Sequence, residues 1–480
     1  MNATYVFWVL LKILFMEGAL MVAPALIGFA YGQNASGLCY LFVALGAMAL
    51  GAAAFFRQPK SKTTRAKEGL VIAGLAWIVI SLVGAIPLCL TGEAGFTDAF
   101  FEIVSGFTTT GASIFPRVES LCRATLFWRA FTHFIGGMGV LVFVMAILSF
   151  NDSQSMHIMR AEVPGHQAGK LVSKMKANSR ILYLIYVALT AVEIAFLLFG
   201  GLDLFEAVIH AFSTAGTGGF SMYSDGIAHF NSPYVEWVVT AFMLLFSINF
   251  NMFFFLLAGS LREVFKNEEL RWFGAIVLAA GLTVTLNILP QTAGFWQALR
   301  QGFFCVAALI STTGFSGVDF GAFPDLAKGV LLAVMFVGAC SGSTGGGIKV
   351  SRIAISTKSA LSQVRKQISP RSVQPVKFEG KLVDPTLQSG ILTYLALYVV
   401  IFAVSFFFLC TDPFVTLGES FTAVSACINN VGPGLGAVGP TGNYAGLSVL
   451  SKLILCFDML AGRLELYPMI ALLIPSVWKR

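Results

Sequence analysis

Long apolar runs separated by short polar connections follow one another along almost the whole chain. A helix needs about 20 apolar residues to cross a bilayer. Ten runs approach or exceed that length: residues 7–30, 38–56, 69–91, 125–149, 181–201, 234–258, 272–290, 326–348, 387–410 and 446–475. The pattern therefore predicts an all-α integral membrane protein with ten spans, whose two ends lie on the same side of the membrane.

Four shorter segments with a common pattern lie between these runs. Each begins with an acid or amide, continues through mostly apolar or small residues, and ends in short polar residues and a glycine: residues 98–111, 206–219, 301–314 and 419–432. About ten helical residues extend only about 15 Å, which is half of the hydrocarbon thickness. The segments are therefore predicted to be half-helices, and irregular backbone at that depth must be buried in protein or line a watery path.

The ends of the four half-helices are rich in oxygen and carry no charge. If they converge, their carbonyl and hydroxyl groups form a ring that can replace the water around a monovalent cation. The final glycine of each segment permits backbone torsions that bulkier residues resist. The alternative is four re-entrant packing elements with no ion between them, a use that oxygen-rich, charge-free ends suit poorly.

Composition and charge add an orientation to this picture. The chain is 57% hydrophobic and 11% charged, which excludes an ordinary soluble protein, and its eight cysteines show no metal-site spacing. The net charge of +7 comes from basic residues that crowd alternate connections, at 57–67, 160–180, 262–271 and 349–381. The positive-inside rule places these connections and both ends of the chain in the cytoplasm. The half-helices then enter from outside, and their C-terminal ends reach the membrane centre, where the helix dipole favours a cation.

The repeated segment also divides the chain into units. An N-terminal two-helix hairpin is followed by four units of helix, half-helix and helix, and a cytoplasmic loop before the last unit is the largest candidate contact surface. The predicted boundaries are 1–60 for the hairpin, 69–150, 180–260, 271–350 and 385–480 for the units, and 351–383 for the loop. Four similarly oriented units predict a pseudo-fourfold arrangement around one pore, whereas a secondary transporter with a midplane site usually has two inverted halves.

Five motifs carry a family resemblance: TTTGAS (108–113), HFIGGMG (133–139), GSTGGGIKV (342–350), NNVGPGLG (429–436) and AGRLEL (461–466). Together they resemble the TrkH/TrkG potassium-uptake subunits of the bacterial Trk/Ktr superfamily over essentially the whole chain, and the N-terminal hairpin is similar to the TrkH branch. The resemblance implies a homodimer in the bacterial cytoplasmic membrane, with one potassium pore per subunit. It also implies gating by a cytosolic TrkA-like nucleotide-binding ring, so that the nucleotide binds the partner and not this chain.

Carried over position by position, the resemblance places a potassium selectivity filter at the end of each half-helix. The filter residues are Thr108, Thr109, Thr110 and Gly111; Gly216, Thr217, Gly218 and Gly219; Ser311, Thr312, Thr313 and Gly314; and Asn429, Asn430, Val431 and Gly432. In the resembled family the four glycines favour potassium. The three glycines of the second segment depart from the pattern, which leaves a less selective sodium and potassium transporter as an alternative. A channel and a proton- or sodium-coupled symporter are not distinguished.

Glycines interrupt the apolar run 326–348. Glycine at this density breaks a helix, and a broken helix in a bilayer must line a cavity or be buried in protein. In the resembled family the corresponding stretch is a mobile loop that obstructs the pore, so the candidate gate residues are Gly342, Ser343, Thr344, Gly345, Gly346 and Gly347. A phosphate-binding loop would have similar glycine spacing, but Ile348 stands where its lysine must be, and a membrane span precedes it.

A charged residue, Arg463, lies inside the last apolar run, and a guanidinium within a span is a functional candidate by default. Its counterpart in the resembled family points into the pore below the filter, where its charge would repel a resident cation. Arg463 is therefore the second part of the candidate gate. The alternatives are a structural pair with Asp458 or Glu465, or a side chain that reaches the cytoplasmic interface.

Other polar residues are given structural interpretations. Asn249 and Asn251 interrupt the run 234–258, where packing is the favoured role. Lys349 and Arg352 follow the candidate gate, but topology alone accounts for basic residues there. Interior positions are expected for His133 and His210, and close helix approach for Gly136, Gly137 and Gly139.

An enzyme is the remaining class to consider. The sequence 342–345 faintly resembles the serine motif of intramembrane proteases, but such an enzyme needs a histidine on a later span, and none follows His229. A fourfold pore motif has no part in that chemistry, and no other set of enzymatic residues is recognisable. The sequence therefore predicts a transport protein with no catalytic residues and no nucleic-acid partner.

Overall fold

The computed structural model describes residues 1–56, 59, 66–139, 175–372 and 374–478, and almost all regular elements among them are helices. In chain order they are α1 (Ala3–Ala30), α2 (Asn34–Phe56), α3 (Ala66–Leu90), α4 (Phe96–Phe107), α5 (Arg123–Gly137), α8 (Met175–Phe199), α9 (Leu204–Gly216), α10 (Pro233–Phe246), α11 (Phe250–Leu257), α12 (Leu261–Lys266), α13 (Glu268–Ile288), α14 (Phe295–Ile310), α15 (Asp325–Val337), α16 (Val350–Ile368), α17 (Pro385–Leu409), α18 (Leu417–Ile428), α19 (Val449–Arg463), α20 (Tyr467–Leu473) and α21 (Pro475–Trp478). Two short strands, β1 (Lys377–Phe378) and β2 (Lys381–Leu382), pair antiparallel. The predicted all-α membrane fold is confirmed.

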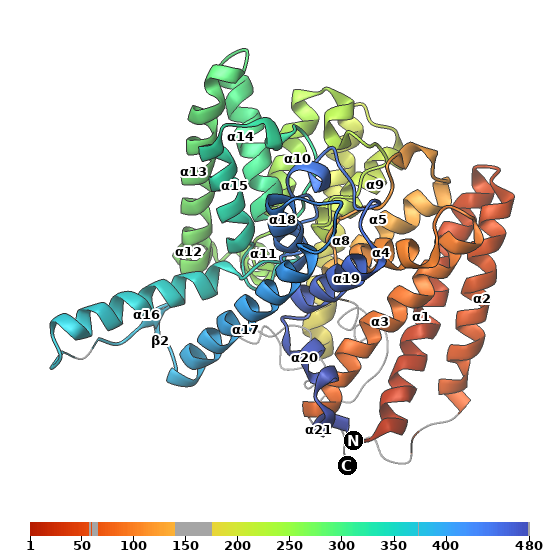
Figure 1. Cartoon of the computed structure of the whole chain (residues 1–480), viewed down its shortest axis with the longest axis horizontal. Helices are drawn as coiled ribbons and strands as arrows, with labels where there is room; N and C mark the ends of the chain where they lie inside the picture. Colours follow the sequence, from red (N-terminus) through yellow and green to blue (C-terminus); the bar gives the residue numbers. More distant parts are fainter. Residues whose placement is uncertain (57–58, 60–65, 140–174, 373, 479–480) are drawn as a thin grey trace.

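Among the described residues, six helices are long and apolar enough to cross a membrane: Ala3–Ala30, Asn34–Phe56, Ala66–Leu90, Arg180–Phe199, Glu268–Gln291 and Pro385–Leu409. Each corresponds to one predicted span. Large apolar side chains such as Phe42, Val399 and Phe407 are exposed on these helices, as expected for surfaces that face lipid. Figure 1 shows α1 and α2 at one side of the molecule and α13 at the other, with α18 and α19 between them.

The helix that follows each half-helix is shorter than a span. α5 ends at Gly137, α15 at Val337 and α19 at Arg463, while α10 and α11 form a pair bent by 94°. The part of the predicted span 125–149 beyond residue 139 lies outside the described residues.

The predicted spans 234–258 and 446–475 are each interrupted, and the breaks have local causes. The side chain of Asn249 accepts a hydrogen bond from the Asn251 amide at 2.9 Å, which caps α11 and starts a new helix in a new direction. After α19, Glu465 and Leu466 both have positive φ, at 55° and 70°, which an α-helix cannot contain.

The acids that begin the half-helix pattern include residues that cap the helices. In α9 the carboxylate of Asp203 accepts a hydrogen bond from the Glu206 amide, and the carboxylate of Glu206 accepts one from the Asp203 amide. Thr416 and Glu419 form the same reciprocal box at the start of α18. These boxes bond amides that a helix cannot bond within itself, and so fix where the half-helices start.

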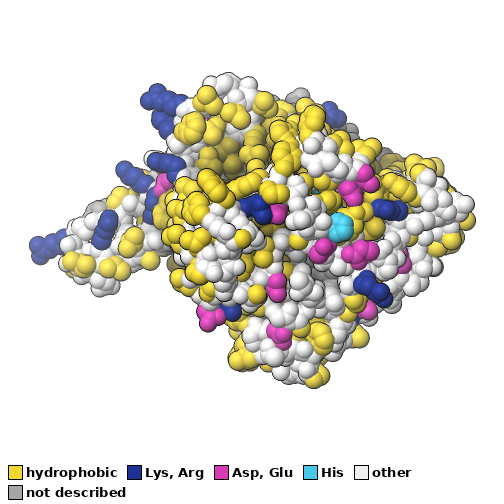
Figure 2. All heavy atoms as spheres, turned by 90° about the horizontal axis from the view of Figure 1, so that it is seen from above, with side chains coloured by type: hydrophobic (Ala, Val, Ile, Leu, Met, Phe, Trp, Pro, Cys, Tyr) yellow, Lys and Arg dark blue, Asp and Glu magenta, His cyan; other side chains and the backbone are white. Residues whose placement is uncertain are grey.

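One part of the chain departs from the helix bundle. α16 and the β1–β2 hairpin extend sideways as an arm, and the start of α1 and α21 lie near each other at one end of the molecule (Figure 1). Lys and Arg side chains are spread along the arm in the space-filling view (Figure 2). The arm lies directly after the Gly-rich segment that was predicted as a gate.

Candidate functional site

The four half-helices α4, α9, α14 and α18 end in one shared backbone conformation. Each is followed within two residues by a non-glycine residue whose φ lies between 54° and 61°, namely Thr109, Thr217, Thr312 and Asn430. Two residues later each segment has a glycine with φ between 68° and 93°, namely Gly111, Gly219, Gly314 and Gly432. Left-handed backbone is uncommon outside glycine and is retained where the surroundings fix it, often at functional sites. The four predicted segments therefore follow the same path.

These ends, residues 108–111, 216–219, 311–314 and 429–432, form a closed ring. Each terminal glycine faces the backbone carbonyl oxygen that precedes the terminal glycine of the next unit, and a Cβ atom added to the glycine would lie within 3.0 Å of that oxygen. The pairs in order are Gly111 with Gly218, Gly219 with Thr313, Gly314 with Val431, and Gly432 with Thr110. Because the fourth unit returns to the first, the four ends enclose one opening, and only glycine fits at each contact.

Side chains brace the ring from within its wall. The hydroxyl oxygens of Thr108 and Thr110 lie 2.8 Å apart, and those of Ser311 and Thr313 lie 2.7 Å apart. The amide nitrogen of Asn430 donates to the Thr110 hydroxyl at 3.0 Å and so joins the fourth unit to the first. These bonds hold the side chains of the ring ends to one another and to the neighbouring unit.

The glycines of the second segment have a packing reason. A Cβ atom on Gly216 would lie within 3.0 Å of the backbone of His133 in α5, and one on Gly218 would meet the His133 ring. That ring is fully buried and stacks on Phe220 at 4.2 Å between centroids. The space that larger residues would occupy is therefore filled by α5, so the three glycines do not by themselves loosen the ring.

Residues 338–348, which we call the intramembrane loop, lie against the inner side of the ring, and Lys349 caps the start of α16. The Gly346 amide donates to the Thr312 hydroxyl at 2.6 Å, and the Gly347 amide donates to the Asn429 carbonyl at 3.1 Å. A Cβ atom on Gly345 would lie 2.7 Å from the Ser311 carbonyl oxygen. The predicted gate residues thus contact the third and fourth segments directly, and glycine allows that approach.

The break between α10 and α11 holds the other side of this loop. The Phe250 amide donates to the Gly342 carbonyl, and the Cys340 amide donates to the Ser247 carbonyl, both at 3.0 Å. The Thr344 hydroxyl donates to the Phe246 carbonyl at 3.1 Å. Two interrupted helices therefore satisfy each other's free backbone groups, which is how broken helices are tolerated at membrane depth.

Arg463, the last residue of α19, joins three units. Its guanidinium donates to the Thr344 carbonyl at 2.6 Å, and to the carbonyls of Gly136 and Gly137 at the C-terminal end of α5. The negative end of a helix dipole favours a cation at that position. The side chain is thus fastened between the intramembrane loop of the third unit and the first unit, while Glu465 pairs with Arg352.

Lys349 and Arg352 have specific contacts at this site, so topology alone does not account for them. The Lys349 ammonium donates to the Gly345 carbonyl of the intramembrane loop. The Arg352 guanidinium pairs with Glu465 and lies 4.2 Å from the centroid of the Tyr394 ring. The start of α16 therefore contacts both the loop and the segment that follows Arg463.

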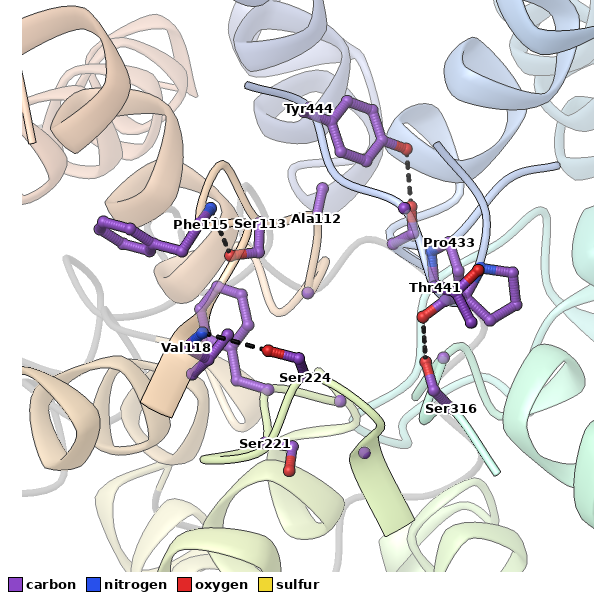
Figure 3. Close-up of a pocket in the computed structure, with 18 of the residues that line it drawn as sticks. Ala112, Ser113, Phe115, Val118, Ser221, Ser224, Ser316, Pro433, Thr441 and Tyr444 are labelled. Atoms are coloured by element: carbon purple, nitrogen blue, oxygen red, sulfur yellow. Dashed lines mark hydrogen bonds between the residues drawn. The ribbon is translucent and has the colours of Figure 1, made fainter. Parts of the chain in front are cut away.

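A hollow lies above the ring on the side from which the half-helices enter. All four terminal glycines line it, together with the loops that follow them. Figure 3 shows Ser113, Ser221 and Ser316 on three of these loops around the hollow. The lining also includes Arg129 of α5, which the sequence interpretation did not single out although it lies inside the predicted span 125–149. Among the residues that the structure describes, no cluster of His, Cys, Asp and Glu suits a bound metal ion.

Interrupted helices that meet around an oxygen-lined opening within an all-α membrane fold define a membrane transport protein. The chain belongs to the TrkH family of cation transport proteins, which matches residues 42–479. It is 32% identical to the Trk system potassium uptake protein TrkH of Escherichia coli K12 and 34% identical to that of Halomonas elongata, with 98% of each chain covered in both comparisons. It is similar to the crystal structure of the potassium transporter TrkH from Vibrio parahaemolyticus, with a TM-score of 0.89, 28% identity and 100% of both chains covered. The family resemblance is confirmed, and the chain is a transporter rather than an enzyme.

Proposed function

We propose that this chain takes up potassium across the bacterial cytoplasmic membrane, with the ring as its selectivity filter. The closed cycle of terminal glycines and carbonyl oxygens carries the proposal, because such a ring can replace the hydration shell of a potassium ion. The relatives in Escherichia coli and Halomonas elongata are named as potassium uptake proteins, which supports the choice of ion. A less selective sodium and potassium transporter and a proton- or sodium-coupled symporter are the alternatives.

The intramembrane loop and Arg463 form the proposed gate. The loop lies against the ring at Thr312 and Asn429, and Arg463 fastens it to the end of α5. A guanidinium near the ion path raises the free energy of a cation there, since like charges repel strongly where water is scarce. Opening then requires Arg463 to leave its carbonyl partners and the loop to move from the ring.

The arm is the proposed contact surface for a cytosolic TrkA-like nucleotide-binding ring. Leu361, Val364 and Ile368 of α16 are exposed and lie on one side of the helix at spacings of three and four residues. The start of the same helix contacts the gate through Lys349 and Arg352. A partner that moves α16 would therefore act on the gate. We also propose a homodimer and cytoplasmic ends of the chain, in keeping with the family resemblance.

Rubidium uptake into proteoliposomes that contain only this protein tests the proposal. We compare the wild type with Gly111→Ala, whose methyl group would meet the Gly218 carbonyl. Gly274→Ala in α13 is the matched control, because a Cβ atom there has nothing within 4 Å. We expect rubidium uptake that excess potassium blocks and excess sodium does not, and at least a ~100-fold loss in Gly111→Ala, because a displaced carbonyl costs several kcal/mol of ion coordination.

The outcomes separate the alternatives. Equal block by sodium and potassium would indicate the less selective transporter, and uptake that requires a proton or sodium gradient would indicate a symporter. Wild-type uptake in folded Gly111→Ala would contradict the assignment of the ring as the filter. Size-exclusion chromatography of each variant establishes that it folds.

A further inference from the structure

A buried ion pair stands behind the first two ring segments. The Nε atom of Arg129 in α5 lies 2.7 Å from a carboxylate oxygen of Glu102 in α4, and the two side chains are 2% and 0% exposed. Burial of two charges is costly unless the geometry is good and the remaining polar atoms are bonded. Such a pair in the interior of a membrane protein is a candidate for a functional role.

The remaining polar atoms of the pair bond to the loops that leave the ring. Glu102 accepts hydrogen bonds from the Ser113 hydroxyl at 3.0 Å and from the Ile114 amide at 2.9 Å. Arg129 donates to the Ser113 hydroxyl at 3.2 Å and to the Ser221 carbonyl at 3.3 Å. Ser113 and Ser221 each follow the terminal glycine of their segment by two residues. The pair therefore ties the outer ends of the first and second segments to each other.

A stacking contact adds to this tie. The guanidinium carbon of Arg129 lies 4.0 Å from the centroid of the Phe220 ring, between Gly219 and Ser221. The Phe220 ring also stacks on His133, which fills the space beside Gly216 and Gly218. An arginine can hold such an arrangement because its planar fork bonds in several directions and stacks on aromatic rings.

The four units differ at the position of Glu102. The fifth residue of each repeated segment is Glu102, His210, Cys305 and Ala423 in chain order. The His210 ring bonds to the Ser221 hydroxyl at 2.9 Å, so the second unit has a polar tie at the equivalent place. Cys305 and Ala423 are buried among apolar side chains. Polar ties therefore hold the outer ends of the first two segments, whereas packing holds this position in the other two.

We infer that Arg129 and Glu102 are positioning residues that fix the spacing between the first and second ring segments and thereby set the discrimination between potassium and sodium. This inference rests on the proposed function of the ring as a filter. Sodium is the smaller ion, so a ring whose first two segments can relax toward each other coordinates it more closely. The two residues act through the loops at Ser113, Ile114 and Ser221, and neither residue needs to contact the ion.

Ion competition in proteoliposomes measures this role. The readout is the ratio of the sodium concentration to the potassium concentration that halves rubidium uptake. Arg129→Lys keeps the positive charge but replaces the fork with a point charge, which cannot bond Glu102, Ser113 and Ser221 together. We expect the ratio to fall about tenfold, the scale of one lost hydrogen bond to a charged group.

The matched control is Arg300→Lys. Arg300 of α14 lies at the same Nε to carboxylate distance of 2.7 Å from Glu236 of α10, although these side chains are 21% and 13% exposed. We expect this variant to keep the wild-type ratio, because loss of a general structural pair does not change the spacing of the ring. If wild type and Arg300→Lys discriminate between the ions and Arg129→Lys does so equally well, the inference is wrong while the proposed filter stands.

A second variant, Ser113→Ala, makes a smaller change and tests the inference even if Arg129→Lys does not fold. Ser113→Ala removes the hydroxyl shared by Glu102 and Arg129 and leaves both charges paired. We expect a fall in the ratio of about threefold, in keeping with one neutral hydrogen bond. If Arg129→Lys does not fold, a wild-type ratio in Ser113→Ala overturns the inference. Absence of rubidium uptake in both the wild type and Arg463→Ala, in which the proposed gate is weakened, would instead contradict the proposed function itself.

Discussion

The outer and inner halves of this site use the same device, a helix that ends inside the membrane, in opposite ways. In the outer half, four half-helices end alike and their glycines fit against one another in a closed cycle. In the inner half the interruptions differ: α10 bends into α11, α15 leads into the Gly-rich loop, and α19 ends at a charged residue. The four equivalent half-helix ends form one ring, whereas the three different interruptions of the inner half lie beneath that ring.

The bonding of the two halves differs as well. Neutral side chains bond within the ring wall, as between Asn430 and Thr110, and the buried pair of Arg129 and Glu102 joins the loops behind it with both charges paired. The intramembrane loop is fastened by two cations, because Arg463 bonds to the Thr344 carbonyl and Lys349 bonds to the Gly345 carbonyl. A carbonyl released by a cation can find another partner at little cost if water enters, so the inner half is the one suited to movement. Under the proposed function, the outer half would select the ion and the inner half would gate its path.

The largest effect on this comparison is expected from Arg463→Ala. The substitution removes the bonds to Gly136, Gly137 and Thr344 and removes a positive charge near the ion path. We expect rubidium uptake without a partner protein to rise by about tenfold, which corresponds to about 1.4 kcal/mol of barrier. The block by potassium relative to sodium should not change, because the ring is intact. Proteoliposome flux assays measure both quantities.

Arg463→Lys is the control for this prediction. Lysine keeps the charge but cannot bond three carbonyls in a fixed geometry. We therefore expect a flux between those of the wild type and Arg463→Ala. An unchanged flux in Arg463→Ala would remove this residue from the gate, and a change in selectivity would show that the inner half also sets the ring.

A smaller effect is expected at the junction between the arm and the gate. Arg352 of α16 pairs with Glu465, two residues after Arg463. Arg352→Glu and Glu465→Arg each place like charges together, which loosens the segment after α19, so we expect a rise in rubidium flux of about threefold. The double exchange restores opposite charges, and a double-mutant cycle should return the flux toward the wild-type value.

Lys358→Glu is the matched control for the charge exchange. Lys358 lies six positions further along α16 and pairs with Glu268 of α13, not with the segment after α19. We expect no change in flux in the absence of a partner. Additive effects of Arg352→Glu and Glu465→Arg, with no recovery in the double variant, would show that the pair does not link the arm to the gate.

Much of this site could be predicted from sequence because its signals are local. Half-helix length, terminal glycines, a Gly-rich interruption and a charge within an apolar run are all visible in short windows. The resemblance then gave Arg463 a role, and its contacts place it against the predicted loop. The all-α membrane fold followed from the same apolar runs.

The contacts between units could not be predicted in this way. Thr110 and Asn430 are bonded across 320 positions of sequence, and no periodicity records which segments become neighbours. The sequence shows acids at the start of the pattern but not their role. The structure shows that Glu206 and Glu419 belong to capping boxes. The bend at Asn249 was missed because a cap inside an apolar run looks like a single polar interruption. The bonding of Arg129 depends on loops from two units.

The smallest expected effect concerns the loops of the outer half and tests whether they hold together as one unit. Glu119, in the loop after the first ring segment, accepts hydrogen bonds from the Ser224 amide at 2.6 Å and from its hydroxyl at 2.7 Å. Partial burial acts to raise the pKa of Glu119, but the hydrogen bonds from Ser224 outweigh it and hold that pKa below its ordinary value of 4.5. This link stabilises the folded loops at pH values above the ordinary pKa and is lost as the pH falls through the lowered one.

Hydrogen exchange of the Ser224 amide measures this link. We expect its protection factor to stay constant from about pH 7 to about pH 5 and to fall below about pH 4, because the carboxylate must be protonated before the bonds weaken. Glu119→Gln should lower the protection at neutral pH and remove its dependence on pH, since an amide oxygen is a weaker acceptor than a carboxylate. A protection factor that follows pH equally in both proteins would assign the effect to another group. The loops that carry Glu119 and Ser224 would then be held together by packing. Packing also holds the third and fourth units at Cys305 and Ala423, the positions equivalent to Glu102.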